Sequence, residues 1–153
     1  MNKLFNEVFN SETAEKKLSK LSEIIEIIKS GYKGFEEEFI ESVLILLDDE
    51  NEFIRIKMTE ISEYMKDERV VDKLCIKLEN DRNYFVRGFS AKALGSIGNI
   101  KAKKNLESAL SDKEGFVVSF AAQALKTINM KNSFTNKLDL LRAKIKENQQ
   151  NVE

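Results

Sequence analysis

The sequence predicts an all-α fold, an α-α superhelix in which tandem helix pairs stack into a solenoid. The 153-residue chain has no Pro, six Gly and 33% charged residues, a composition typical of a mostly helical protein. Apolar residues recur at intervals of three and four along nearly the whole chain, as on amphipathic helices. One two-helix motif also occurs three times. Because a helix pair cannot bury its apolar face alone, we expect the copies to share one core in a single domain over residues 1–153.

The first predicted element is an N-terminal capping helix at about residues 12–30. Ser11 followed by Glu12 and Glu15 is typical of a helix start. One apolar face follows, formed by Leu18, Leu21, Ile25 and Ile28. Gly31 and Gly34 then separate this helix from the first repeat.

Three repeats are predicted at about residues 35–66, 68–97 and 101–129. The segments that begin at Asn83 and Gly115 match with an offset of 31, which aligns Phe85 with Phe116. An offset of 32 aligns Phe53 with Phe85. A turn with acidic, amide or hydroxyl side chains precedes each copy, at Asp48-Asp49, Asn80-Asp81 and Ser111-Asp112. The C-terminal end is expected to be capped by a helix at about residues 133–148, predicted from Phe134, Leu138, Leu141 and Ile145.

The composition argues against most familiar catalytic and metal sites. With no His and one Cys, the chain lacks Ser-His and Cys-His pairs, imidazole ligands and internal disulfides. We therefore expect no catalytic residue, no metal, no cofactor and no enzymatic activity. Neither a run of 18 apolar residues nor a secretory signal is present, so we expect no membrane span. Cys75 is expected to be a small buried residue in a reducing, cytoplasmic compartment.

Residues Asp81 to Asn99 carry the run D-x4-V-R-x3-A-x-A-L-G-x-I-G. This run resembles HEAT repeats, in the short form found in bilin lyases and many small bacterial proteins. The resemblance covers about residues 35–129, although Val118 stands where the third copy should have Arg. It implies a right-handed superhelix whose second helices line the inner, concave face. It also implies an intramolecular ladder between turn Asp and helix Arg, Asp49 with Arg55 and Asp81 with Arg87, which would satisfy turn amides and tie neighbouring units together.

The helix phase predicts which side chains point to the concave face. If Val86, Ala93 and Leu94 point into the core, the opposite side of that helix and its counterparts face a ligand. The resulting set contains acidic and basic side chains and several small residues, which suits a protein ligand. We expect one protein partner to bind there, with a protein inhibitor or toxin-neutralising immunity protein as a specific form. The predicted binding residues are Arg55, Thr59, Glu60, Glu63, Arg87, Ala91, Lys92, Ser96, Ser119, Ala122, Gln123 and Lys126.

Two alternatives follow from charge and from the resemblance. Residues 1–52 carry a net charge of −7 and residues 101–153 a net charge of +4, so the basic end could contact nucleic acid. Its candidate phosphate contacts are Lys101, Lys103, Lys104, Lys126, Lys131 and Lys137. The mixed charge of the inner face makes nucleic acid, including a DNA glycosylase-like role, the less expected partner. The repeat type implies a bilin-lyase-like subunit as the other alternative. We expect a monomer or weak self-association.

Overall fold

The computed structural model describes residues 2–150 of the chain, and the side chains of residues 3–146. These residues form α-helices and one 3-10 turn and contain no strand, which confirms the all-α prediction. The elements, in chain order, are α1 (Asn2–Phe9), α2 (Ala14–Lys29), α3 (Glu37–Leu46), α4 (Glu52–Ser62), α5 (Glu68–Asn80), α6 (Tyr84–Ile97), η1 (Ile100–Ala102), α7 (Lys103–Ala109) and α8 (Gly115–Gln150).

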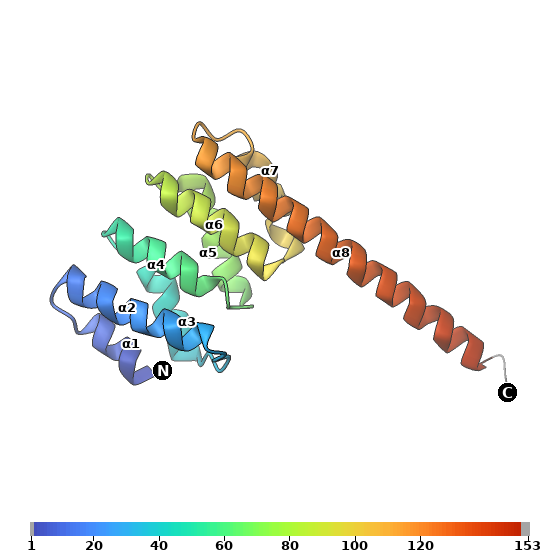
Figure 1. Cartoon of the computed structure of the whole chain (residues 1–153), viewed down its shortest axis with the longest axis horizontal. Helices are drawn as coiled ribbons and strands as arrows, with labels where there is room; N and C mark the ends of the chain where they lie inside the picture. Colours follow the sequence, from blue (N-terminus) through green and yellow to red (C-terminus); the bar gives the residue numbers. More distant parts are fainter. Residues whose placement is uncertain (1, 151–153) are drawn as a thin grey trace.

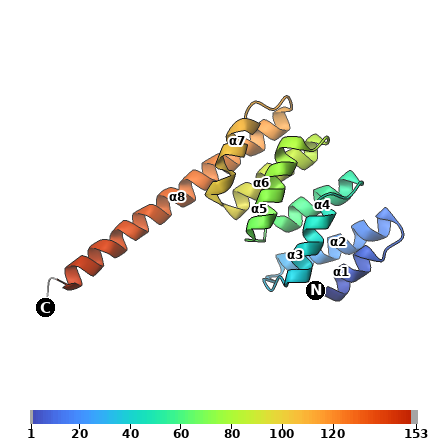
Figure 2. The ribbon, with the colours of Figure 1, turned by 180° about the vertical axis from the view of Figure 1, so that it is seen from behind.

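The helices stack in two layers. Helices α2, α4, α6 and α8 lie side by side in one layer, and α1, α3, α5 and α7 form the layer behind it (Figures 1 and 2). Each odd-numbered helix is followed after a short turn by its even-numbered partner. This arrangement is the predicted α-α solenoid, and the outer surface of the even-numbered layer is called the even-helix face below.

Helices α4 and α6 begin in the same way because the sequence repeats the same capping residue. Asn51 accepts a hydrogen bond from the Phe53 N–H at 2.9 Å. Asn83 accepts one from the Phe85 N–H at 2.8 Å. Side-chain oxygens at this position satisfy amides that have no partner within the helix. Helix α6 ends at Gly98, whose φ of 78° suits glycine.

The N-terminal end differs from the predicted single capping helix. Helix α1 precedes α2, and the two make a fourth helix pair on the plan of the repeats (Figure 1). Thr13 caps α2, accepting from the Lys16 N–H at 3.3 Å, as the two asparagines cap α4 and α6. Phe5 of α1 is buried, and its ring lies 4.4 Å from the Phe39 ring, centroid to centroid. Helix α1 therefore extends the shared core.

The C-terminal end differs as well. The predicted helix at 133–148 is the second part of the continuous helix α8, which runs from the third repeat well past the stack (Figure 1). No Gly or Pro interrupts the chain between residues 116 and 150, so nothing ends the helix. Phe134 is 65% exposed and Ile145 58% exposed. This section does not cover the last repeat.

Among the described helices, none has a segment of the length and apolar character needed to cross a membrane.

Candidate protein-binding surface

Two arginines tie neighbouring repeats together. The Arg55 Nε and Nη2 atoms donate to the Asp81 carboxylate at 2.8 and 3.0 Å. The Arg87 Nε and Nη2 atoms donate to Asp112 in the same way, at 2.7 and 2.9 Å. Each arginine thus pairs with the turn aspartate of the following repeat. The pairs expected within a repeat, Asp49 with Arg55 and Asp81 with Arg87, are therefore wrong by one repeat.

Each arginine reaches its own turn through the backbone. Arg55 Nη1 donates to the Asp49 carbonyl at 2.8 Å, and Arg87 Nη1 donates to the Asp81 carbonyl at 2.9 Å. The turn carboxylates also accept backbone N–H groups, as Asp112 Oδ1 does from Glu114 at 2.9 Å. The hydrogen bond from Arg87 lowers the pKa of Asp112 despite its partial burial. These residues hold the stack together.

The ladder and the close contacts between even-numbered helices remove four predicted binding residues from the surface. Arg55, Thr59, Arg87 and Ala91 are buried. Each of the helices α4 and α6, which carry these four residues, is flanked by two neighbours in its own layer and covered by the odd-numbered layer behind. Only a narrow strip of its surface is left, so these four side chains are not available to a ligand on this face.

The other predicted residues do reach the surface, and three of them, Glu60, Glu63 and Lys92, belong to a set of ion pairs that crosses the even-helix face. Lys92 Nζ lies 2.6 Å from Glu63 Oε1, and Lys29 Nζ lies 3.0 Å from Glu60 Oε1. Burial opposes ionisation of Glu60, but Lys29 and Lys57 outweigh it and lower its pKa. We call Lys29, Lys57, Glu60, Glu63 and Lys92 the charged strip. Ser96 of α6 and Ser119, Ala122, Gln123 and Lys126 of α8 are exposed as well.

Five aromatic side chains gather at the start of α6 and α8, and we call them the aromatic patch: Tyr84, Phe85, Phe89, Phe116 and Phe120. Phe116 lies at their centre, with ring centroids 5.2 Å from Phe85, 5.4 Å from Phe89 and 4.9 Å from Phe120. Gly88 leaves room for the Phe116 ring, which any side chain there would overlap. Tyr84 and Phe85 are 37% and 38% exposed.

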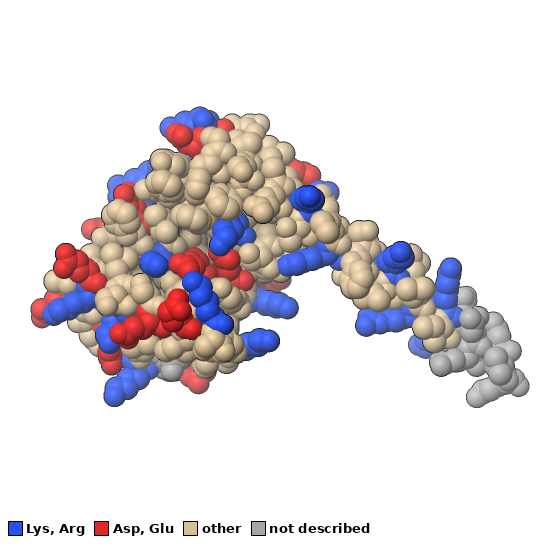
Figure 3. All heavy atoms as spheres, viewed as in Figure 1, with Lys and Arg blue, Asp and Glu red and all other residues tan. Residues whose placement is uncertain are grey.

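Sequence reasoning missed this patch as a functional feature. Phe85 and Phe116 entered only as markers of the repeat, although their alignment places rings from neighbouring repeats side by side. The first eleven residues of α8, 115–125, contain no charged side chain. Figure 3 shows the result as an uncharged area over the beginnings of α6 and α8, with charged side chains gathered over α2 and α4.

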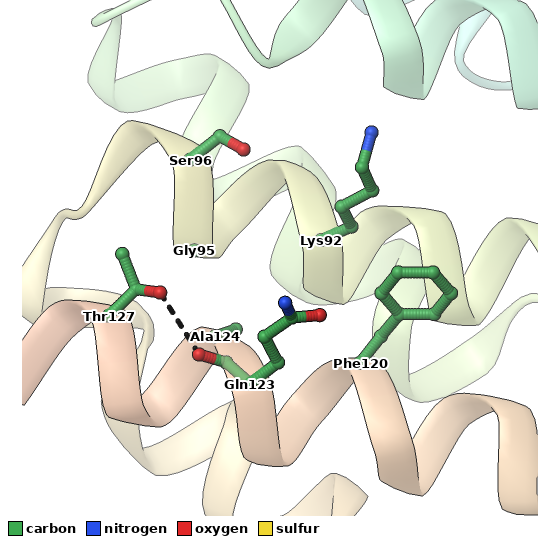
Figure 4. Close-up of a pocket in the computed structure, with 7 residues that line it drawn as sticks. All are labelled: Lys92, Gly95, Ser96, Phe120, Gln123, Ala124 and Thr127. Atoms are coloured by element: carbon green, nitrogen blue, oxygen red, sulfur yellow. Dashed lines mark hydrogen bonds between the residues drawn. The ribbon is translucent and has the colours of Figure 1, made fainter.

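A shallow hollow between α6 and α8 joins the two features. It is lined by Lys92, Gly95, Ser96, Phe120, Gln123, Ala124 and Thr127. Lys92 belongs to the charged strip and Phe120 to the aromatic patch, and their side chains border the same hollow (Figure 4). The helices approach closely here, since a Cβ on Gly95 would lie 2.7 Å from the Ala124 Cα atom. Three predicted binding residues, Lys92, Ser96 and Gln123, thus share one concave site.

The lysines considered for nucleic acid are divided between the two layers. Lys101 Nζ lies 2.6 Å from Asp72 Oδ1, and Lys103 Nζ lies 3.8 Å from Glu107 Oε1, both with partners in the odd-numbered layer. Lys131 Nζ donates to the Ser96 carbonyl at 2.8 Å. Lys104, Lys126 and Lys137 are exposed. Half of the set is thus already engaged with groups of the protein.

Comparison with solved structures finds the same fold in an enzyme. The structure of human deoxyhypusine hydroxylase in complex with glycerol matches with a TM-score of 0.68 and 18% sequence identity. The match covers 84% of this chain and 43% of that chain, so this chain spans less than half of that protein. Among curated proteins, none matches the sequence.

This likeness overturns the prediction that the chain is not an enzyme. Stacks of this fold do carry catalysis, and the lack of His and of a second Cys is too weak a ground for that prediction. At 18% identity the likeness shows the fold and assigns no activity to this chain.

The family comparison agrees with the repeats seen in the structure. The family of HEAT repeats matches residues 40–126, which include most of the first repeat, all of the second and nearly all of the third. Helices α4 to α7, the aligned residues Phe53, Phe85 and Phe116 and both arginines of the ladder lie in this range. This chain belongs to the HEAT repeat family.

Proposed function

We propose that the chain binds one protein partner on its even-helix face, where the aromatic patch meets the charged strip. The observation that carries the proposal is the partly exposed aromatic patch on a surface without charge. Aromatic side chains are enriched, and charged ones depleted, at the centre of protein interfaces. Rigid rings there bury a large area on binding at little entropic cost.

The charged strip has the character of an interface rim. Its members alternate in sign, and the side chains of Lys29 and Lys92 are each 44% exposed. Charges of this kind set the register and the association rate of a partner more than the final affinity. A nucleic acid backbone would instead require basic side chains in a row, whereas Glu60 and Glu63 interrupt this one. The surface therefore favours a protein partner.

The test compares Phe85→Lys with a matched control, Phe53→Lys. Phe53 occupies the position of Phe85 in the first repeat and is 60% exposed, but it lies outside the patch. Purified, tagged chains are used to capture partners from the native cell, and thermal melts establish that all variants fold. We expect the unmodified chain and Phe53→Lys to retain one stoichiometric protein that Phe85→Lys loses by at least about tenfold.

Equal capture by Phe85→Lys and the unmodified chain would contradict the proposal, and so would equal loss with Phe53→Lys. Lys92→Glu tests the rim, since it should leave the melt nearly unchanged and slow the association. Recovery of a toxin, neutralised on binding, would give the narrower inhibitor or immunity form of this function. Binding of labelled duplex DNA that weakens steeply with salt would support the nucleic acid alternative in its place.

A further inference from the structure

The last section of α8 is a second surface, separate from the even-helix face. Lys131 makes the last hydrogen bond seen between this helix and the repeats, to the Ser96 carbonyl at 2.8 Å. From residue 132 to residue 146 every side chain is exposed except Leu138, which is half-buried. Figure 1 shows this section extending away from the stack as a straight helix.

An apolar seam runs along this section. Phe134, Leu138, Leu141 and Ile145 follow one another at intervals of four, three and four. These are successive d, a, d and a positions of a heptad repeat, the spacing of a coiled-coil seam. Phe134 is 65% exposed, Leu141 50% and Ile145 58%. We call these four residues the tail seam. It is a narrow strip suited to a second helix, since a helix that packs on a broad apolar surface needs a wider face.

Basic residues flank the seam. With Leu138 at position a, the flanking e and g positions are held by Thr135, Lys137, Arg142 and Lys144. Residues 130–146 contain five basic side chains and one acidic side chain, Asp139. Asp139 lies on the side away from the seam and pairs with Arg142 at 3.3 Å. Residues at e and g decide which helices pair, through attraction or repulsion across the seam.

We propose that the tail seam docks an amphipathic helix of a partner protein that carries acidic residues at the flanking positions. A second copy of this chain does not fit. In a parallel pair Lys137 would face Arg142 of the other copy, and in an antiparallel pair it would face Lys144. Both arrangements place like charges together, whereas glutamates on a foreign helix would be attracted by all three cations. No residue of the seam belongs to the aromatic patch or the charged strip, so this proposal does not rest on the proposed function.

The probe is a fluorescent three-heptad peptide with Ile and Leu at the a and d positions and Glu at e and g. The control peptide has Lys at e and g. Anisotropy with the full chain at low and high salt should show the acidic peptide bound at least tenfold more tightly than the basic one, with the difference reduced by salt. Reversing the flanks with Lys137→Glu and Lys144→Glu should invert the preference.

Leu141→Asp tests the seam and Leu140→Asp is its matched control. Leu140 is 65% exposed but lies at position c, outside the seam. Both variants should fold, because the two side chains are exposed. We expect Leu141→Asp to lose the acidic peptide at least tenfold and Leu140→Asp to retain it.

Equal binding of the two peptides, or equal loss in the two leucine variants, would overturn the proposal. A stable homodimer broken by Leu141→Asp would also overturn it, in favour of a second copy. Binding to vesicles of anionic lipid without binding of the acidic peptide would replace it with a membrane surface.

Discussion

Replacing Arg87 by Met isolates the energy of the ladder. The change keeps most of the apolar stem but removes the two hydrogen bonds to Asp112, at 2.7 and 2.9 Å, and the one to the Asp81 carbonyl at 2.9 Å. Arg87 is 7% exposed and the Asp112 side chain 13%, so water replaces the lost partner only in part. Breaking a buried ion pair costs about 3–5 kcal/mol. Asp112 still accepts the Glu114 N–H, so we expect about 3 kcal/mol, the lower end of that range.

The free energy of unfolding is measured by urea denaturation followed by circular dichroism at the helix band. For a chain of this size each kcal/mol of lost stability lowers Tm by roughly 2–4 °C, so Tm should fall by about 6–12 °C. Arg82→Met is the matched control. Arg82 is exposed and makes one longer hydrogen bond, to the Glu50 carbonyl at 3.3 Å, so its loss should cost no more than about 0.5 kcal/mol.

A stability of Arg87→Met within about 0.5 kcal/mol of the unmodified chain, or equal to that of Arg82→Met, would refute the reasoning. Adding Asp112→Asn to Arg87→Met should cost less than the sum of the two single changes. The double variant no longer leaves an unpaired charge in the partly buried turn.

Three further predictions test the packing and the titrating groups. Gly95→Ala should cost about 1–3 kcal/mol because its Cβ would overlap Ala124, whereas Gly115→Ala, with open space around it, should leave urea stability equal or slightly higher. The pKa of Asp112 is lower in the folded chain than in the unfolded chain. The resulting stability is present above the unfolded-state pKa of about 3.9 and is lost as the pH falls through the folded-state pKa. Acid should therefore reduce the urea midpoint more in the unmodified chain than in Asp112→Asn. Burial, with nearby carboxylates, raises the pKa of Cys75 to about 11, so iodoacetamide at about pH 8 should modify it at least about 100-fold more slowly in the folded chain than in urea, as followed by mass spectrometry.

The repeats were predictable because their signals lie close together in the sequence. The offsets of 31 and 32 come from residues that every stacked helix pair must supply, namely a capping side chain and apolar residues at helical spacing. Helix α1 was missed because it is short, 8 residues, and its buried positions Phe5 and Val8 span less than one turn. The continuity of α8 was missed because its apolar residues pack on the core up to Ile128 and are mostly exposed to solvent after it. In the sequence this change looks like the start of a new helix, although no Gly or Pro ends the helix there.

The choice of ladder partner and of surface residues required tertiary structure. Arg55 lies six residues after Asp49 and 26 before Asp81, and sequence spacing alone favours the nearer carboxylate. Stacking brings the distant carboxylate alongside instead. In the same way, the helix phase of α4 and α6 separates the side that packs on the odd-numbered layer from the opposite side. It does not reveal how much of that opposite side the neighbouring even-numbered helices cover. Thr59 and Ala91 are buried for this reason.

The departure from the repeat pattern at Val118 follows from the same ladder. Val118 lies four residues after Glu114, as Arg87 lies four after Asn83, so it occupies the ladder position of the third repeat. An arginine there would require the turn aspartate of a following repeat, and α8 instead continues to Gln150 without a turn. An unpaired cation in this half-buried position would lose hydration without gaining a partner. At the other end, Lys17 holds the equivalent position in α2 and lies 3.7 Å from Asp49, so the turn aspartate of the first repeat is not left without a cation. The ladder thus ends at the last repeat that has a turn aspartate after it. An apolar residue at the ladder position marks the final repeat of the described stack.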